Sequence, residues 1–385
     1  MKHVRCVLTF LIAILILAGC SAATPATTTQ STTAATAPAL PEGIRNIIIV
    51  IGDGMGDAHL QLGEQASGKE LVFRDWTLIH SNTNSFNSSG EAIKTTDSAA
   101  GGTALATGQL TTNGKVGRDS SGKDIKNIME YAQEFGKSTG VISTDAVYGA
   151  TPAAFSAHCS DRDDSTTIMY SQFASNINLF CANKTDEARE LRDFGTSCGY
   201  TYLTTFSDIN KNMDQDKLYF QLPLAGSSPG MTLSDILPSA MDYLDQDTDG
   251  FVLMVEQAHI DKYSHSNDAL PTSRCVEMLN DAVVTILDWI GDRDDTAILI
   301  TADHETGELT VGTADGGYSS FTSSAGNEVY YYYGSTSHSQ TPVSVYTYGF
   351  TPDWTPYYLD AEGTLIKNIS VFSMMYELLE NPLHD

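Results

Sequence analysis

The sequence predicts an α/β fold with a mostly parallel central sheet and helices on both faces. Short apolar runs rich in Val and Ile, such as residues 46–51, have the continuous hydrophobicity of strands buried on both faces. Segments with helical spacing lie between these runs. Alternation of strands with helices is typical of a parallel sheet that is covered on both sides.

The other elements follow from the same two patterns. Further buried strands are expected at residues 141–142, 251–255, 297–301 and 343–346. Helices are expected at residues 125–135, 232–244 and 274–290. The first ends at Gly136 and the last at Gly291, because glycine commonly ends a helix.

The first residues read as a targeting segment. Lys2 and Arg5 precede an apolar run at residues 7–17, which is too short to span a bilayer. The sequence Leu-Ala-Gly-Cys that ends at Cys20 resembles the lipobox of bacterial lipoproteins. Residues 1–20 are therefore predicted to be a lipoprotein signal peptide with a lipid on Cys20; an ordinary cleaved signal is the alternative.

A low-complexity segment separates this leader from the rest of the chain. Residues 21–41 consist almost entirely of Ala, Thr, Ser and Pro and carry no charge, so they are expected to form a disordered tether. Residues 42–385 are long enough for one large domain. This organisation predicts an exported protein on the extracytoplasmic face of the membrane.

The charge is strongly acidic. The chain has 21 Lys and Arg against 48 Asp and Glu, which gives a net charge of −27. Such a field argues against nucleic acid and anionic lipid surfaces as partners. Phosphate-bearing substrates would also be repelled, so an anion site must be made locally positive by metal ions or arginine. Solubility outside the cell accounts for most of the charge.

Four cysteines follow the leader, an even number that permits disulfides in an exported chain. They are Cys159, Cys181, Cys198 and Cys275. Their connectivity cannot be deduced, and Cys181 with Cys198 is the preferred pair because it is the nearest in sequence.

Residues of the kinds that bind metals follow the predicted strands. Asp53 comes directly after residues 46–51, between glycines that let the backbone turn sharply; a turn-forming aspartate is the alternative. Asp303 and His304 come directly after residues 297–301.

The strand at residues 251–255 runs straight into a third group. Glu256 stands at its end, and Asp261 and His265 are four residues apart, a spacing that puts both on one face of a helical turn. An exposed Asp–His pair is the alternative. His259 lies off that face and is expected to be structural or exposed, while His338 precedes the strand at residues 343–346.

Four such groups at successive strand ends predict one shared centre. Ligands of open α/β sheets gather outside the carboxyl ends of the strands. Carboxylates with imidazoles, and no cysteine at a suitable spacing, favour Zn²⁺ in a catalytic role.

Ser98 is the candidate nucleophile. It opens a predicted helix of small residues, and a helix N-terminus attracts anions. Serine and aspartate before a helix are usually caps, so this position gains weight only from the metal-type groups elsewhere.

Six motifs in this order resemble the alkaline phosphatase family, from about residue 46 to the C-terminus. They are D-G-M-G at Asp53, T-D-S-A-A at Ser98, A-T-P-A-A-F-S-A-H at residues 150–158 followed by Arg162, V-E-x-A-x-I-D-K-x-x-H at residues 255–265, T-A-D-H-E-T-G at Asp303 and His304, and S-H-S-Q at His338.

The resemblance implies an alkaline-phosphatase-like fold and a catalytic domain over residues 42–385 that binds two Zn²⁺ and one Mg²⁺. One Zn²⁺ would be held by Asp261, His265 and His338, the second by Asp53, Asp303 and His304, and Mg²⁺ by Asp53, Thr151 and Glu256. Small phosphate monoesters would be hydrolysed to alcohol and inorganic phosphate through phosphoserine at Ser98. Arg162 would clamp the phosphoryl oxygens and Lys262 would support the phosphate through water. The planar guanidinium of Arg162 suits this role, although a solvated ion pair with its acidic neighbours is the alternative.

One position departs from the family. Gly149 stands where the family usually carries Asp or His, two residues before the Thr ligand. This departure predicts a wetter, weaker Mg²⁺ site and a freer Lys262. The Tyr-rich segment at residues 316–333 is expected to be either a flap or strands over the site.

Other functions remain as alternatives. A phosphodiesterase or a sulfatase could share this architecture, although such enzymes typically use Thr or a modified Cys or Ser as nucleophile. A surface lipoprotein that stores zinc or scavenges phosphate would need the ligands without the nucleophile. The sequence leaves a monomer and a homodimer open.

Overall fold

The computed structural model describes residues 43–185, 187–203, 205–222, 231–314 and 317–380. The predicted signal peptide at residues 1–20, the lipid-bearing Cys20 and the tether at residues 21–41 lie outside the described residues. Among the described helices, none combines the length and the apolar character that crossing a membrane requires.

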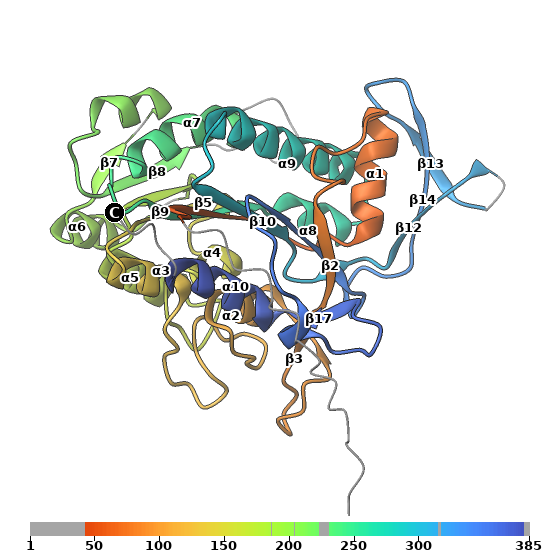
Figure 1. Ribbon diagram of the computed structural model, residues 1–385, viewed down its shortest axis with the longest axis horizontal. Coiled ribbons are helices and arrows are strands. Elements are labelled where there is room, and N and C mark those ends of the chain that lie inside the picture. The colour runs from red at the N-terminus through yellow and green to blue at the C-terminus, as the bar shows by residue number, and fades with distance from the viewer. Residues whose placement is uncertain (1–42, 186, 204, 223–230, 315–316, 381–385) are drawn as a thin grey trace, which may run out of the picture. The chain divides into compact units, whose positions relative to one another are not determined.

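A ten-stranded sheet forms the centre of the described part of the chain (Figure 1). Its strands, in spatial order, are β17 (Leu365–Lys367), β2 (Thr77–Asn82), β16 (Val343–Tyr348), β10 (Thr296–Thr301), β1 (Asn46–Gly52), β9 (Phe251–Gln257), β5 (Ser138–Ala146), β6 (Leu179–Asn183), β8 (Leu218–Leu222) and β7 (Thr201–Leu203). Strand β16 is antiparallel to both neighbours, and the other pairs are parallel. The predicted mostly parallel sheet is therefore confirmed.

Helices cover both faces of the sheet, as predicted (Figure 1). The core on one face includes side chains of α1 (Asp57–Ser67), α7 (Leu233–Leu244) and α9 (Ala269–Ile290). The core on the other face includes side chains of α2 (Ser98–Thr107), α3 (Ile128–Glu134), α5 (Ser165–Ala174), α6 (Arg189–Ser197) and α10 (Ile369–Glu380). Successive residues of β1 alternate between the two cores, since neighbouring side chains of a strand point to opposite faces.

Short elements complete the described chain. They are the helices α4 (Ala150–Ala154) and α8 (His259–Ser264), the 3₁₀ turns at Phe206–Lys211 and Thr355–Tyr357, the strand pair β3 (Asn84–Ser85) and β4 (Lys94–Thr95), the strand pair β11 (Glu305–Thr306) and β15 (His338–Ser339), and a separate sheet of β12 (Leu309–Gly312), β14 (Glu328–Tyr333) and β13 (Ser319–Thr322).

Two predicted helices begin elsewhere than expected. The first begins at Ile128 instead of residue 125, because the side chain of Asn127 caps it and Glu130 reaches back to the Asn127 N–H. The last begins at Ala269, five residues before the predicted start. Its first turn contains Pro271, and proline is tolerated there because the first N–H groups of a helix have no partner within it.

The Tyr-rich segment forms strands. Strands β13 and β14 build an antiparallel hairpin, and β12 pairs with the other edge of β14. Val329 and Tyr333 of β14 form one apolar cluster with Leu62 and Ala66 of α1. The small sheet is therefore anchored on α1, and of the two readings that the sequence left open, the strands are the correct one.

The predicted disulfide is wrong, since Cys181 and Cys198 are not bonded to each other. Cys181 lies in β6 and belongs to the core under α7 and α9. Cys198 follows α6 and packs against the core on the opposite face of the sheet. A disulfide needs Cβ atoms roughly 4 Å apart, which two side chains on opposite faces cannot reach.

Substitutions at two neighbouring valines of α9 test which face of this helix is packed into the core. Val283 is fully buried and Val284 is 36% exposed. We expect Val283→Ala to lower the free energy of unfolding by roughly 1–3 kcal/mol, because it leaves a cavity in the core. The matched control Val284→Ala should change it by about 0.5 kcal/mol or less. Urea denaturation measures both, and equal losses would contradict the placement of this helix face.

Candidate metal centre

The predicted metal-type residues meet at the carboxyl edge of the central sheet. Asp53 follows β1, Glu256 is the next-to-last residue of β9, and Asp303 follows β10 after one intervening residue. These three strands are adjacent and parallel, so their carboxyl ends share one edge. His338 reaches the same edge from β15, just before the antiparallel β16 begins there.

The turn after β1 requires a glycine. Gly54 has a φ of 73°, and a Cβ at this position would lie 2.8 Å from both the Cβ of Asp261 and the Oγ1 of Thr306. The D-G-M-G motif therefore allows the loop that carries Asp53 to approach α8 and β11 closely.

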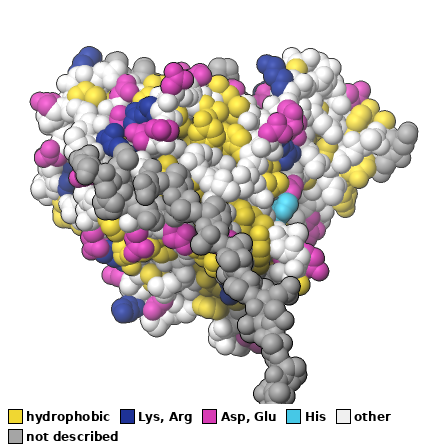
Figure 2. Space-filling view, in the orientation of Figure 1, with side chains coloured by type: hydrophobic (Ala, Val, Ile, Leu, Met, Phe, Trp, Pro, Cys, Tyr) yellow, Lys and Arg dark blue, Asp and Glu magenta, His cyan; other side chains and the backbone are white. Residues whose placement is uncertain are grey.

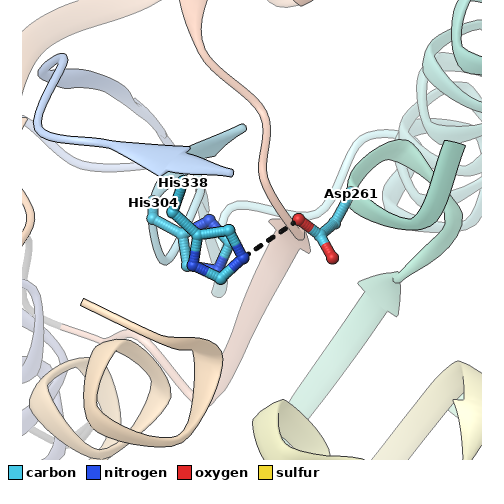
Figure 3. Close-up of side chains that lie close together, drawn as sticks. All are labelled: Asp261, His304 and His338. Atoms are coloured by element: carbon cyan, nitrogen blue, oxygen red, sulfur yellow. Dashed lines mark ion pairs between the residues drawn. The ribbon is translucent and has the colours of Figure 1, made fainter. Parts of the chain in front are cut away.

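One cluster consists of Asp261, His304 and His338, whose potential ligand atoms all lie within 4.8 Å of one another (Figure 3). The Nε2 atom of His338 is 3.4 Å from Oδ1 of Asp261, and the rings of the two histidines stack with centroids 3.5 Å apart. His265 stands beside this cluster, with its Nε2 atom 3.3 Å from Oδ2 of Asp261 and 3.1 Å from Nε2 of His338.

A second cluster consists of Asp53, Asp303 and His304, and all three are buried. His304 thus borders both clusters, whereas the sequence assigned it to one. Oδ1 of Asp53 and Oδ2 of Asp303 are buried without a hydrogen-bond partner. Buried carboxylate oxygens are costly unless a cation or a donor satisfies them, so this donor set fits a metal ion.

The pKa shifts of the clustered carboxylates also indicate a site for a cation. Burial raises the pKa of Asp53 well above its usual value, and the negative charges of Asp303, Asp261 and Glu256 raise it further. At Asp261 burial acts in the same upward direction, but hydrogen bonds from His265 and His338 outweigh it and lower the pKa. A bound cation would relieve the repulsion among these carboxylates.

Two further predicted residues adjoin Asp53 on the side of β5. The hydroxyl of Thr151, in α4, donates to Oδ2 of Asp53 at 3.2 Å. Glu256 accepts a hydrogen bond from Ser143, and burial together with the nearby charge of Asp145 raises its pKa to about 8.

Ser98 is the first residue of α2, and its hydroxyl lies 3.1 Å from Nε2 of His304. The cap of this helix is Asp97, whose Oδ1 accepts from the N–H of Ala100 at 2.9 Å. Capping by Asp97 leaves the Ser98 hydroxyl available at the metal-type cluster, which answers the alternative that Ser98 is only a cap.

Arg162 is oriented by the same aspartate. Its Nη1 atom donates to Oδ2 of Asp97 at 3.2 Å, and its backbone N–H donates to the carbonyl of Gly114. Burial opposes the charged form, but Asp97 outweighs this effect and raises the pKa of Arg162. The guanidinium is therefore tied to the residue next to Ser98 and is not merely solvated among its acidic sequence neighbours.

The prediction of a freer Lys262 is wrong. Its ammonium forms an ion pair with the carboxylate of Asp145, a residue of β5. Asp145 was not predicted as a site residue, although an acidic residue shortly after a predicted strand was the available signal. His259 lies outside the clusters, with its Nδ1 atom 3.2 Å from Oγ1 of Thr144, in agreement with the expectation of a structural role.

Thr306 is a second site residue that the sequence motifs did not single out. Its hydroxyl donates to Oδ1 of Asp261 at 2.5 Å and lies 3.3 Å from Nδ1 of His304. It therefore fixes the orientation of residues in both clusters.

The face of the molecule shown in Figure 2 is acidic, but its acidic side chains are not gathered in one patch. Figure 2 shows Asp and Glu side chains spread over the visible face, with fewer Lys and Arg among them. Positive charge at the site itself comes from Arg162 and from Lys262, which Asp145 already neutralises.

Comparisons with known proteins agree with this geometry. The family model described as alkaline phosphatase matches residues 44–186 and 181–368. Alkaline phosphatase 4 of Bacillus subtilis (strain 168) is 33% identical over 297 residues, which cover 70% of this chain and 63% of that protein. Alkaline phosphatase of Escherichia coli (strain K12) is 27% identical over 330 residues, covering 68% of this chain and 70% of that protein.

A solved structure shows the same fold. Alkaline phosphatase from the Antarctic bacterium TAB5 superposes with a TM-score of 0.77 at 23% identity, covering 88% of this chain and 98% of that one. The match to the Bacillus subtilis protein spans less than two thirds of that relative's length. Since the family model covers most of the sequence, the chain belongs to the alkaline phosphatase family.

Proposed function

We propose that this protein hydrolyses phosphate monoesters to an alcohol and inorganic phosphate through a phosphoserine at Ser98. The observation that carries the proposal is the position of the Ser98 hydroxyl. It lies 3.1 Å from Nε2 of His304, beside carboxylates that have buried oxygens without a hydrogen-bond partner, and its neighbour Asp97 holds Arg162. Membership of the alkaline phosphatase family supports the same activity.

The proposed cofactors are two Zn²⁺ and one Mg²⁺. One Zn²⁺ would bind Asp261, His265 and His338, the other Asp53, Asp303 and His304, and Mg²⁺ would bind Asp53, Thr151 and Glu256. Such ions, when bound, lower the pKa of a coordinated hydroxyl and neutralise charge on the phosphoryl group.

Ser98 and Arg162 have different roles in the proposed reaction. The oxygen of Ser98 attacks phosphorus as the ester bond to the alcohol breaks, and water later breaks the Ser98–phosphorus bond to release inorganic phosphate. Arg162 can donate two parallel hydrogen bonds to phosphoryl oxygens, which orients the group for attack at Ser98. Charge neutralisation suits this substrate class, because uncatalysed hydrolysis of phosphate monoesters is extremely slow.

We further propose that the enzyme is exported and anchored through a lipid on Cys20, with residues 21–41 as its tether. The charged start, short apolar run and lipobox-like sequence of residues 1–20 support this placement. Apart from this lipid no membrane contact is proposed, and nucleic acid is not expected as a partner because of the net charge of −27. A homodimer stays open.

Removal of the Ser98 hydroxyl tests the nucleophile. We expect Ser98→Ala to reduce turnover of p-nitrophenyl phosphate by roughly 10³-fold or more, because the variant lacks the hydroxyl that forms the proposed covalent intermediate. Binding of inorganic phosphate, measured by calorimetry, should persist. The control Ser197→Ala, at an exposed position on α6, should keep full activity. If the protein only stored zinc or scavenged phosphate, the unaltered protein, Ser98→Ala and Ser197→Ala would all show the same low turnover.

A substrate panel separates the proposed activity from related chemistry. The value of kcat/KM for p-nitrophenyl phosphate should exceed the values for its bis-ester and its sulfate analogue by roughly three orders of magnitude. Both analogues carry one negative charge less than the monoester dianion, so they gain less from a cationic site. A preference for the bis-ester would indicate a phosphodiesterase, and a preference for the sulfate a sulfatase.

Gly149 leads to a prediction about the third ion. Because this residue offers no side chain to the site around Thr151 and Glu256, we expect Mg²⁺ to bind weakly there. Enzyme stripped with EDTA and reloaded with Zn²⁺ should gain activity gradually as Mg²⁺ is titrated. Saturation at trace Mg²⁺ would contradict the prediction, and Gly149→Asp provides the comparison variant.

A further inference from the structure

An ion pair stands at the rim of the site, near Glu256, and its lysine is the one to which the family resemblance gives a role in supporting bound phosphate. The ammonium of Lys262, next to Asp261 on α8, contacts Oδ1 of Asp145. The side chain of Lys262 is 43% exposed and that of Asp145 is 28% exposed. A pair this accessible contributes little to stability, so its position beside the site is the more informative feature.

Asp145 is held in place by the residues of the site. Its backbone N–H donates to Oγ of Ser143 at 2.8 Å, and the hydroxyl of Ser143 donates to Glu256. The backbone of Asp145 is therefore fixed relative to the proposed Mg²⁺ ligand Glu256, and the carboxylate is delivered to Lys262 from a strand and not from a loose loop.

Gly149 leaves the room that the carboxylate of Asp145 occupies. A Cβ at Gly149 would lie 2.9 Å from Oδ2 of Asp145 and 3.0 Å from the carbonyl oxygen of Ala146. The φ of Gly149 is −51°, which any residue can adopt, so backbone conformation does not require a glycine here. The limited space requires the glycine, because any larger side chain at this position would press on the Asp145 carboxylate.

Gly149 therefore leaves space for the Asp145 carboxylate, and this carboxylate pairs with the Lys262 ammonium. We propose that Asp145 is a positioning residue that holds the Lys262 ammonium away from bound phosphate and thereby weakens the binding of the phosphate product. This inference rests on the proposed phosphatase function. The carboxylate and a phosphate dianion compete for the same ammonium, so neutralising Asp145 releases Lys262 to pair with the phosphate.

The test is a double-mutant cycle on the metal-loaded enzyme, with inorganic phosphate as the probe and calorimetry as the readout. Asp145→Asn should tighten phosphate binding about fivefold. In the Lys262→Met background the same substitution should have little effect, because the ammonium that it releases is absent. Asp145→Glu, which keeps the charge, should bind phosphate like the unaltered protein.

Two more variants make the test independent of overall charge and of folding. Gly149→Ala retains both charges but displaces the Asp145 carboxylate, so it should also tighten phosphate binding, by a smaller factor than Asp145→Asn. Glu134→Gln, at the end of α3, breaks a comparable ion pair with Lys126, which precedes that helix. This pair lies outside the metal-type clusters, so the variant should leave phosphate binding unchanged.

The outcomes separate this inference from the proposed function. Equal tightening by Asp145→Asn with and without Lys262, or no tightening in either background, would overturn the inference while leaving the phosphatase intact. Failure of the unaltered, metal-loaded enzyme to bind phosphate would overturn the proposed function and this inference with it.

Discussion

Repulsion among buried carboxylates is the constraint on which the site depends. Asp53, Asp303, Asp261 and Glu256 converge at one edge of the sheet, and the first three are close enough to histidines to form two metal-type clusters. Two carboxylate oxygens in this group have no hydrogen-bond partner. Cations remove the repulsion and, at the same time, create the local positive field that an acidic protein needs to accept a phosphate dianion.

The side chains converge because adjacent parallel strands end at the same edge of the sheet. Parallel strands β1, β9 and β10 end side by side, and each continues into a short loop or turn that carries ligand-type side chains. Helix α2 then presents Ser98 to His304, while Asp97 caps the helix and orients Arg162. One aspartate thus couples the nucleophile to the guanidinium that would bind the phosphoryl group.

The parts that the sequence could predict are those with local signals. Continuous apolar runs located β1, β5, β9, β10 and β16 but not β6 and β8, which are also buried. The motifs placed Asp53, Glu256, Asp303 and His304 at strand ends that the structure brings to one edge, whereas Thr151 came only from the family resemblance. The start of α3 also has a local signal, the capping pair of Asn127 and Glu130, which the prediction overlooked. The separate positions of Cys181 and Cys198 and the Lys262–Asp145 pair were beyond this reasoning. Each depends on which face of the sheet a side chain occupies or on a neighbour distant in sequence, and pattern alone carries neither. The roles of the site residues and the anchoring through Cys20 stay predictions.

The most direct measurement of the central claim is a crystal structure with anomalous diffraction recorded at the zinc absorption edge. The account predicts two zinc peaks beside the Ser98 hydroxyl. One should lie among Asp261, His265 and His338, and the other among Asp53, Asp303 and His304. Absence of zinc from these clusters in protein purified with its metals, or zinc bound only elsewhere on the surface, would contradict it.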